Sequence, residues 1–161
     1  MSPRAATVPV FEPEYLEGFR QIYEEKIVFN QTLGLRLTEI TPVGRVSARI
    51  DMRHELVGHF AYNRIHGGVI SAALDAIGSA AVMAALAAKH MDESPAKRLE
   101  RFGKLGTIDL RIDYLRPGIG EFFTIHAECL RVGSRVGTSR MEFRGPDGTL
   151  MSAGAAAYIV S

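Results

Sequence analysis

The residue best suited to chemistry in this sequence is a single carboxylate, Asp75. It is the only charged residue among the twenty from Val69 to Ala88. A carboxylate on an apolar helix loses hydration and must be compensated by neighbouring donors, and acid/base residues are found in such environments. Two roles are equally open for Asp75 on this pattern: an acid/base residue, or a structural carboxylate that accepts hydrogen bonds from a neighbouring strand.

The start of the same helix is a second candidate, because His66-Gly67-Gly68 places two residues without side chains in its first turn. Backbone N–H groups are unpaired there, so an incoming carbonyl oxygen could accept hydrogen bonds as negative charge develops on it. Alternatively, the glycines only permit tight packing of helix against strand. Gly67 and Asp75 are eight residues apart and lie on neighbouring helix faces, so a dimer could unite them better than one chain.

Other polar residues near these positions are weaker candidates. Thr107 shares a predicted strand face with polar residues and could orient a water, although such a Thr is often only a strand former. His59 and Asn63 precede the helix and could contact a substrate, but polar loop residues are mostly solvated. His66 itself is better explained as a helix cap or turn residue than as a base.

Several basic residues could receive phosphate groups, for which the shape of Arg is well suited. Most of them are expected to be plain surface charge. The residues concerned are Lys97, Arg98, Arg101, Lys104, Arg116, Arg131 and Arg135.

Motifs for other chemistries are missing. His54-Glu55 is followed by His59 after three residues rather than the two of a zinc-binding helix, and Gly58 weakens a helix there. The sequence contains no phosphate-loop Lys motif, no Gly-x-Ser-x-Gly elbow and no dinucleotide fingerprint. Metal, nucleophilic-serine and nicotinamide mechanisms are therefore not supported.

The apolar pattern predicts the elements that position these groups. Phe11–Asn30 is predicted to be a short amphipathic helix, with Pro13 at its head and apolar residues at helical spacing. Alternation from Leu33 onward, on both sides of a turn at Thr41–Gly44, predicts a hairpin.

The segment Gly67–Lys89 is predicted to be a long helix of about 34 Å at roughly 1.5 Å per residue. Because it has no polar stripe, it must be covered on nearly every side. Asp92–Gly103 is predicted to be a charged connection. Four strands then follow: one through Ile108–Tyr114, and three more over Glu121–Val132, Arg135–Arg144 and Thr149–Val160.

This order of elements indicates an α+β protein, because short turns between consecutive strands favour an antiparallel sheet. One long apolar helix and one curved sheet suit each other. A curved antiparallel β-sheet wrapped around a long central α-helix, here with a short N-terminal helix, is the arrangement called the hotdog fold.

Composition limits the class of protein and its partners. The chain has 161 residues, 47% of them hydrophobic, and a net charge of +1, so we expect one globular domain over residues 1–161, poorly ordered at residues 1–10, that binds no nucleic acid. A single Cys129 and no export signal favour the cytoplasm. Asp75 would cost about as much in a bilayer as the surrounding apolar residues gain, so no membrane span is expected.

From about Asn30 to Val160 the sequence resembles hotdog-fold thioesterases of the phenylacetate-pathway (PaaI) type, in particular YigI-like medium- and long-chain acyl-CoA thioesterases. HGGVISAALDAIGSAAV is similar to the family's His-Gly-Gly turn and helix, with an acidic residue eight positions after the first Gly. LGTIDLRIDYLRPG is similar to the strand on which relatives carry a water-orienting Ser or Thr, here Thr107. RVGSRVG is similar to a strand turn near the CoA nucleotide.

The resemblance implies that Asp75 acts as general base or nucleophile, and that the Gly67 N–H of another subunit polarises the thioester carbonyl. A homodimer is implied, and commonly a homotetramer. It implies no metal or redox cofactor, since CoA is part of the substrate. Many relatives carry Asn or Gln where this chain has His59 and Phe60. The residues expected to contact substrate are His59, Asn63, His66, Gly68, Arg116, Arg131, Ser134 and Arg135.

Three functions fit these observations. The first is hydrolysis of a medium- or long-chain, or an aryl, acyl-CoA by water that Asp75 activates, or through a mixed anhydride. The second is a non-catalytic acyl-CoA-binding or regulatory domain. The third is a hydratase, which would need an Asp and His pair that the sequence does not identify. The three share a fold, and fold alone does not choose among them.

Overall fold

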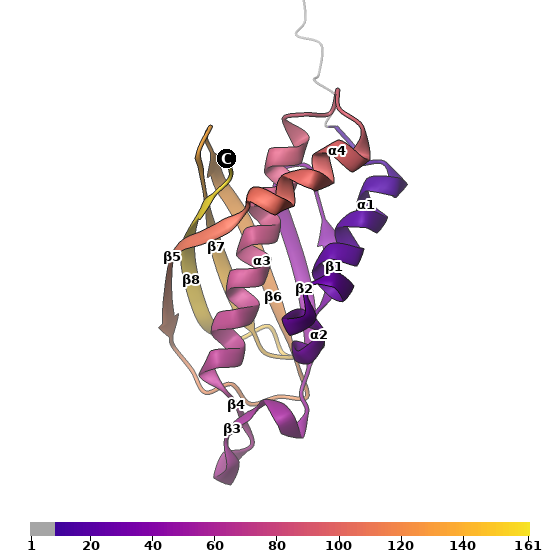
Figure 1. Ribbon diagram of the computed structural model, residues 1–161. Coiled ribbons are helices and arrows are strands. Elements are labelled where there is room, and N and C mark those ends of the chain that lie inside the picture. Colours follow the sequence, from indigo (N-terminus) through magenta and orange to yellow (C-terminus); the bar gives the residue numbers. More distant parts are fainter. Residues whose placement is uncertain (1–8) are drawn as a thin grey trace, which may run out of the picture.

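The computed structural model describes residues 9–161, so most of the segment expected to be poorly ordered, residues 1–10, lies outside the described residues. A six-stranded antiparallel sheet forms one layer, and helices lie on the face around which it curves (Figure 1). The long helix α3 (Gly67–Ala88) runs across this face. The α+β hotdog prediction is confirmed.

The sheet has the strand order β1-β2-β6-β7-β8-β5. Short turns join β1 to β2, β6 to β7 and β7 to β8, which makes each of these neighbours antiparallel. β5 follows a long connection and pairs with β8, so β1 and β5 are the two edges of the sheet. The strands are β1 (Arg36–Ile40), β2 (Arg45–Asp51), β5 (Gly106–Tyr114), β6 (Phe122–Val132), β7 (Val136–Arg144) and β8 (Leu150–Ile159).

Nearly the whole length of α3 is covered, as its lack of a polar stripe requires. Leu74 and Ile77 are fully buried, and so are several alanines between Ala73 and Ala87. Small side chains let the helix lie close to β6 and β7. By length and composition α3 could also cross a membrane, but most of its apolar surface is buried inside the protein.

The N-terminal helix differs from the prediction, because it is interrupted. α1 (Pro13–Arg20) continues into a π-helical turn (Gln21–Lys26), Ile27 is extended, and α2 (Val28–Leu33) follows. The buried Asn30 side chain donates a hydrogen bond of 2.9 Å to the Tyr23 carbonyl, which stabilises the break. Leu33, predicted to begin a strand, is instead the last residue of α2.

The connection predicted at Asp92–Gly103 contains a further helix, α4 (Pro95–Glu100), capped by the Ser94 side chain. A 3-10 turn, Arg101–Lys104, follows it. The helix is too short for its periodicity to be recognised, although Ser94-Pro95 is a helix-start signal.

Arg98 is neither surface charge nor a phosphate contact, the two roles expected for the basic residues of this segment. Arg98 of α4 is fully buried, and its guanidinium lies 2.6 Å from a Glu12 carboxylate oxygen and 4.8 Å from the centre of the Tyr15 ring. The Arg98 guanidinium lowers the pKa of Glu12. Arg98 therefore anchors α4 to α1 and is not available to a phosphate.

A small hairpin, β3 (Val57–His59) and β4 (Arg64–Ile65), precedes α3 where only a loop was predicted. It projects at the end of the molecule opposite α4 (Figure 1). Strands of three and two residues are too short for alternation to reveal them.

The turn between β1 and β2 is packed against α3, and glycine is required there for two reasons. Gly44 has φ of 76°, and an added Cβ would lie 2.9 Å from Ala85 Cβ and 2.7 Å from Cys129 Cβ. We expect Gly44→Ala to lower the free energy of unfolding by about 2–5 kcal/mol, since left-handed backbone costs roughly 1–2 and overpacking roughly 1–3.

Gly148 is the matched control, with φ of 81° and no atom within 4 Å of an added Cβ. Gly148→Ala should therefore show the backbone cost alone, about 1–2 kcal/mol. Urea denaturation of both variants measures the difference. Equal losses would show that α3 does not restrict this turn.

Candidate active site

Asp75 and Thr107, which the sequence identifies separately, are in direct contact. The Thr107 hydroxyl donates to Asp75 Oδ1 at 2.9 Å and lies 3.2 Å from Oδ2. A hydrogen bond to a carboxylate is stronger than a neutral one and fixes the orientation of both groups. The two side chains thus form one unit between α3 and the first residues of β5.

A β-bulge on β5 makes this contact possible. The pairing of β5 with β8 is regular except between Thr107, opposite Tyr158, and Asp109, opposite Ala157. One extra residue on β5 turns Thr107 toward α3, although Asp109 two positions later faces away. The expectation that Thr107 shares a face with the polar residues of this strand is therefore wrong, since that expectation assumed unbroken alternation.

The Asp75 carboxylate is open to a cleft and is not sealed in the interior. The cleft has a volume of about 250 Å³, and Asp75 is half-buried at its wall. Its polar lining residues also include Thr107, Ser79, Tyr158 and Asn30. The remaining lining comes from α2 and the residue before it, from α3, and from the start of β5 and the segment before it: Ile27, Phe29, Ala72, Ala76, Phe102, Leu105 and Gly106.

Two tyrosines support α3 behind the carboxylate. The buried Tyr158 hydroxyl donates to the Asp75 carbonyl at 3.1 Å, and the Tyr23 hydroxyl lies 3.2 Å from Ser79 Oγ. Burial is the main cause that raises the pKa of both phenols, and the nearby Asp75 charge raises that of Tyr158 further. Both phenols therefore remain protonated. Sequence reasoning missed Tyr23, Tyr158 and Ser79. Of the three, only Ser79 could have been recognised locally, because it is a polar residue one helical turn after Asp75.

The helix start is arranged around Gly67. His66 is the helix cap, because its Nδ1 accepts a hydrogen bond of 2.8 Å from the Gly68 N–H. The Tyr114 hydroxyl donates to the Gly67 carbonyl at 2.9 Å. Gly68 N–H is thus engaged, whereas Gly67 N–H, at the first helical position, has no carbonyl within the helix to bond. A carbonyl oxygen approaching this end would meet the Gly67 N–H.

The Gly67 amide and the Asp75 carboxylate do not meet in one chain. Eight residues of α-helix separate them by about 12 Å along the axis at roughly 1.5 Å per residue. Thr107 and Tyr114 of β5 each contact one of the two positions. The two halves of the expected site are therefore held by the same helix and strand, but apart.

The remaining predicted contacts lie away from the Asp75 cleft. His59 and Asn63 belong to the β3–β4 hairpin, where the His59 ring lies 4.9 Å from the Tyr62 ring and Asn63 adopts the left-handed conformation. Neither residue lines the cleft. One chain does not bring them to the carboxylate.

The predicted phosphate-binding residues are divided between the two ends of the sheet. Arg116 follows β5 and donates to the Leu150 carbonyl at the start of β8. Arg131, Ser134 and Arg135 surround the β6–β7 turn at the opposite end and line a hollow of about 280 Å³. A single phosphate group could not contact both sets within one chain.

Among residues 9–161, no three His, Cys, Asp or Glu side chains are close enough together to hold a metal ion. The site therefore consists of a carboxylate, a hydroxyl, a helix-end amide and an apolar cleft. Such groups can activate water and stabilise a developing oxyanion.

Comparison with known proteins identifies the family. The model of the thioesterase superfamily matches residues 62–152. This chain belongs to the thioesterase superfamily. The matched range begins before the helix that carries Gly67 and Asp75 and extends into β8. It leaves out α1 and α2, so the part of the cleft wall that α2 supplies lies outside the family match.

Individual relatives agree with the superfamily assignment. The chain is 34% identical to the medium/long-chain acyl-CoA thioesterase YigI of Salmonella typhimurium over 134 residues. These residues make up 82% of this chain and 84% of that protein. YigI of Escherichia coli gives the same identity and coverage. A crystal structure of a thioesterase-superfamily protein from Shewanella oneidensis superposes with a TM-score of 0.83 at 34% identity, covering 94% of this chain and 100% of that one. The family resemblance expected from the sequence is confirmed.

Proposed function

We propose that this chain is an acyl-CoA thioesterase that hydrolyses medium- or long-chain acyl-CoA to the free acid and CoA. The observation that carries the proposal is the Thr107–Asp75 hydrogen bond of 2.9 Å at the wall of an open cleft, in a member of the thioesterase superfamily. The relatives named acyl-CoA thioesterases support the substrate class.

In the proposed reaction Asp75 acts either on water or on the thioester carbon itself. As general base, it takes a proton from water while the water oxygen attacks the thioester carbon, and it returns that proton to the CoA thiolate as the C–S bond breaks. As nucleophile, its oxygen attacks the thioester carbon and expels the CoA thiolate, and water then hydrolyses the mixed anhydride to the acid and the free Asp75 carboxylate. Both routes use the Thr107 hydroxyl to hold the carboxylate and the Gly67 N–H to stabilise the oxyanion. Neither route requires a metal or a redox cofactor.

The proposed reaction needs a second subunit, because Gly67 and Asp75 are too far apart in one chain. The β5 edge is suited to pairing: it has a neighbouring strand on one side only, and Ile108 is 56% exposed. Two copies joined there would place β5, with its contacts to Gly67 and Asp75, at the dimer interface. We propose a homodimer as the catalytic unit, with a homotetramer as a further assembly.

The acyl group is proposed to lie in the cleft beside Asp75. Its walls are largely apolar and include Phe102 and Leu105 from the segment before β5 and Ile27 and Phe29 from the start of α2. An alkyl chain would gain about 0.8 kcal/mol for each CH₂ group buried there. This lining favours alkyl chains of some length over acetyl groups.

The first test is Asp75→Asn, measured as thiol release from an acyl-CoA series. We expect kcat to fall by about 10²–10⁴, the usual contribution of a general base, while the melting temperature is retained. Thr107→Val should also lower kcat, and Thr107→Ser should recover it.

Asp51→Asn is the matched control, because Asp51 is an exposed carboxylate at the end of β2 that lies neither on the β5 edge nor in the cleft. Wild-type turnover by Asp75→Asn would remove the assignment. Binding of acyl-CoA by the wild type without any hydrolysis would instead favour the non-catalytic function.

Gly67→Pro tests the proposed oxyanion contact, because it removes one N–H at the helix position that tolerates proline best. His66 already has the extended conformation that a residue before proline requires. We expect kcat to fall by about 10²–10³. Gly67→Ala keeps the N–H, and its Cβ would meet only the Tyr114 ring at 3.4 Å, so it should retain activity.

Mixing the Gly67→Pro and Asp75→Asn proteins tests the shared site. Each mixed dimer would contain one intact site, so refolding them together should restore about a quarter of wild-type activity. If both residues acted within one chain, no activity would return.

Ala76→Phe tests the acyl position, since Ala76 lines the cleft one residue after Asp75. Filling the cleft should raise KM for long-chain substrates at least tenfold, the effect of losing about two buried CH₂ groups, and leave short-chain hydrolysis nearly unchanged. An unaltered chain-length profile would place the acyl group elsewhere.

A further inference from the structure

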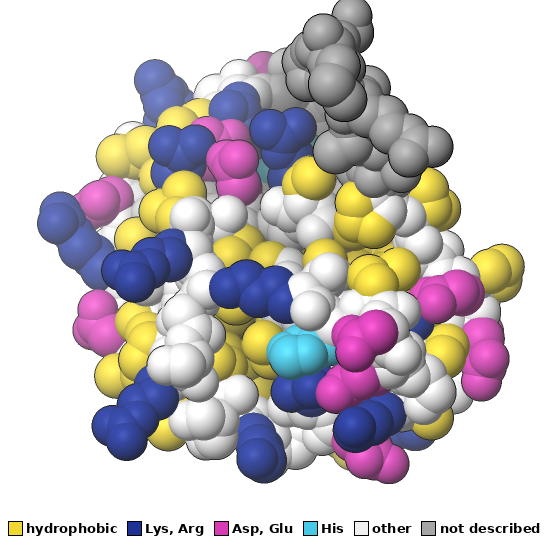
Figure 2. Space-filling model, turned by 90° about the horizontal axis from the view of Figure 1, so that it is seen from above, with side chains coloured by type: hydrophobic (Ala, Val, Ile, Leu, Met, Phe, Trp, Pro, Cys, Tyr) yellow, Lys and Arg dark blue, Asp and Glu magenta, His cyan; other side chains and the backbone are white. Residues whose placement is uncertain are grey.

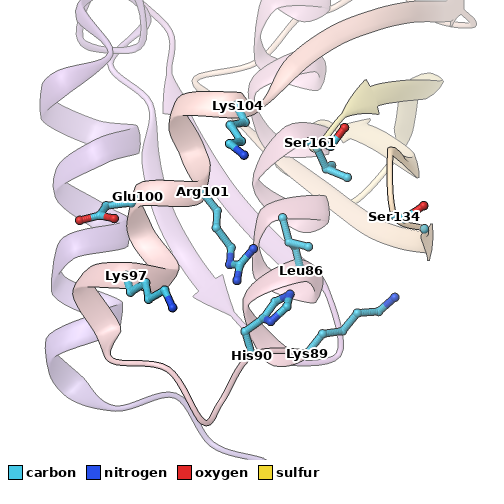
Figure 3. A pocket seen from close by; sticks show the side chains of 11 residues that line it. Leu86, Lys89, His90, Lys97, Glu100, Arg101, Lys104, Ser134 and Ser161 are labelled. Atoms are coloured by element: carbon cyan, nitrogen blue, oxygen red, sulfur yellow. The ribbon is translucent and has the colours of Figure 1, made fainter.

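A second, larger cavity lies at the C-terminal end of α3. Its volume is about 680 Å³, against about 250 Å³ for the cleft at Asp75. It is enclosed by α3, by α4 with the turn that follows, by the β6–β7 turn and by the last residues of the chain (Figure 3). The proposed thioester hydrolysis at Asp75 does not use this cavity.

Positive charge dominates the lining of this cavity. Lys89 and His90 directly follow the end of α3, and Lys97, Arg101 and Lys104 come from α4 and its turn. Figure 2 views this end of the molecule and shows many Lys and Arg side chains, with apolar surface between them. Leu86 and Val160 form the apolar part of the wall.

Carboxylates compensate only part of this charge. Glu93 binds Arg101 through both of its oxygens, at 2.8 and 2.7 Å, and lies 3.3 Å from Lys97 Nζ. The hydrogen bonds from Arg101, and then the contact with Lys97, lower the pKa of Glu93. Its carboxylate therefore remains charged. Glu100 turns its carboxylate away from the cavity, toward α1 (Figure 3). A single carboxylate, Glu93, is therefore paired with two of the four Lys and Arg side chains that line the cavity.

Two of the cations are free to meet a ligand. Lys104 is exposed, and no ion pair holds it within the part of the chain that the structure describes. The Lys89 ammonium donates to the Val132 carbonyl, which holds it beside the β6–β7 turn. An ammonium has three donors, so this contact leaves two for an anion.

The cavity lies on the same side of α3 as the Asp75 cleft. Ser79 lines the cleft and Leu86 the cavity, and residues seven apart lie on one helix face. At the end of β8, Tyr158 lines the cleft and Val160 lines the cavity. Residues two apart in extended backbone point to the same face. From Asp75 to Lys89 the helix rises about 21 Å at roughly 1.5 Å per residue.

We propose that this cavity binds the phosphate groups of the acyl-CoA substrate, with Lys89 and Lys104, which have no carboxylate partner among the described residues, as the main contacts and with Lys97 and Arg101 beside them. The inference rests on the proposed function and deepens it. A ligand with its thioester at Asp75 and a polyanion at its far end matches both the charge of the cavity and its place along α3. The phosphate contacts thereby belong to the end of α3 and the turn after α4, rather than to Arg131 and Arg135, which line an adjoining hollow that shares Gly133 and Ser134 with this cavity.

The experiment compares an acyl-CoA with the same acyl group on pantetheine, which lacks the phosphates. In the double variant Lys89→Ala/Lys104→Ala we expect KM for acyl-CoA to rise at least tenfold, since hydrogen bonds to charged groups are each worth about 1.5–3 kcal/mol. kcat for acyl-CoA and KM for acyl-pantetheine should not change. Added salt should raise KM for acyl-CoA alone.

Lys26→Ala is the control for loss of a charge, because Lys26 is exposed and lies on the N-terminal segment. Equal effects of the double variant on both substrates, or no effect on either, would overturn the proposal. So would a rise in KM that occurs only in Arg131→Ala/Arg135→Ala.

If the wild type hydrolyses neither substrate, the proposed function fails, and the cavity is then tested by binding alone. Calorimetry with adenosine 3′,5′-bisphosphate as the probe should show affinity for the wild type that is at least tenfold weaker in the double variant. Equal affinities would overturn the phosphate site independently of turnover.

Discussion

Burial of α3 is the constraint on which the rest of the structure depends, because a helix without a polar stripe has to be covered on nearly every side. The sheet curves around it, and small residues allow close approach. At Gly44 the β1–β2 turn lies against Ala81 and Ala85, and at Gly78 an added Cβ would meet Ser139 and Met141. Any side chain of α3 that stays partly open is thus an exception to the packing.

In the middle of α3, over residues 72–80, the exceptions lie along one stripe. Ala72, Asp75, Ala76 and Ser79 are half-buried, whereas most residues between and beside them are fully buried. Their spacing places them on a single face of the helix. That face is closed only in part, by α2 and the segment before β5, and the space left over is the cleft. Incomplete coverage of α3 therefore creates the position in which a carboxylate can meet a ligand.

One short helix contributes both to packing and to charge. Arg98 points from α4 into the core and pairs with Glu12, while Lys97 and Arg101 on the same helix and its turn face the cavity at the end of α3. This ion pair fixes where α4 lies, because Arg98 is fully buried and separating it from Glu12 would leave its charge without a partner in the interior. The cationic side chains are positioned as a consequence of that anchoring.

The sequence by itself determined the type of the fold and the identity of the central groups. Periodicity is local, so it revealed α3 and the four strands that follow, and the absence of any other charge in α3 singled out Asp75. The glycines at the helix start were recognised in the same way, whereas Thr107 was singled out by the family resemblance, because the strand pattern placed it on the polar face. These features depend on neighbours within a few residues, which the order of the chain alone specifies.

Only the tertiary structure decided how these groups meet. The Thr107–Asp75 contact depends on a bulge in β5, and the Tyr158–Asp75 contact on the register of β8, which joins residues 83 positions apart. Alternation could not show that Thr107 faces inward, since one extra residue reverses every face assignment beyond it. The break before α2 and the burial of Arg98 likewise follow from packing between distant segments, which no local pattern encodes.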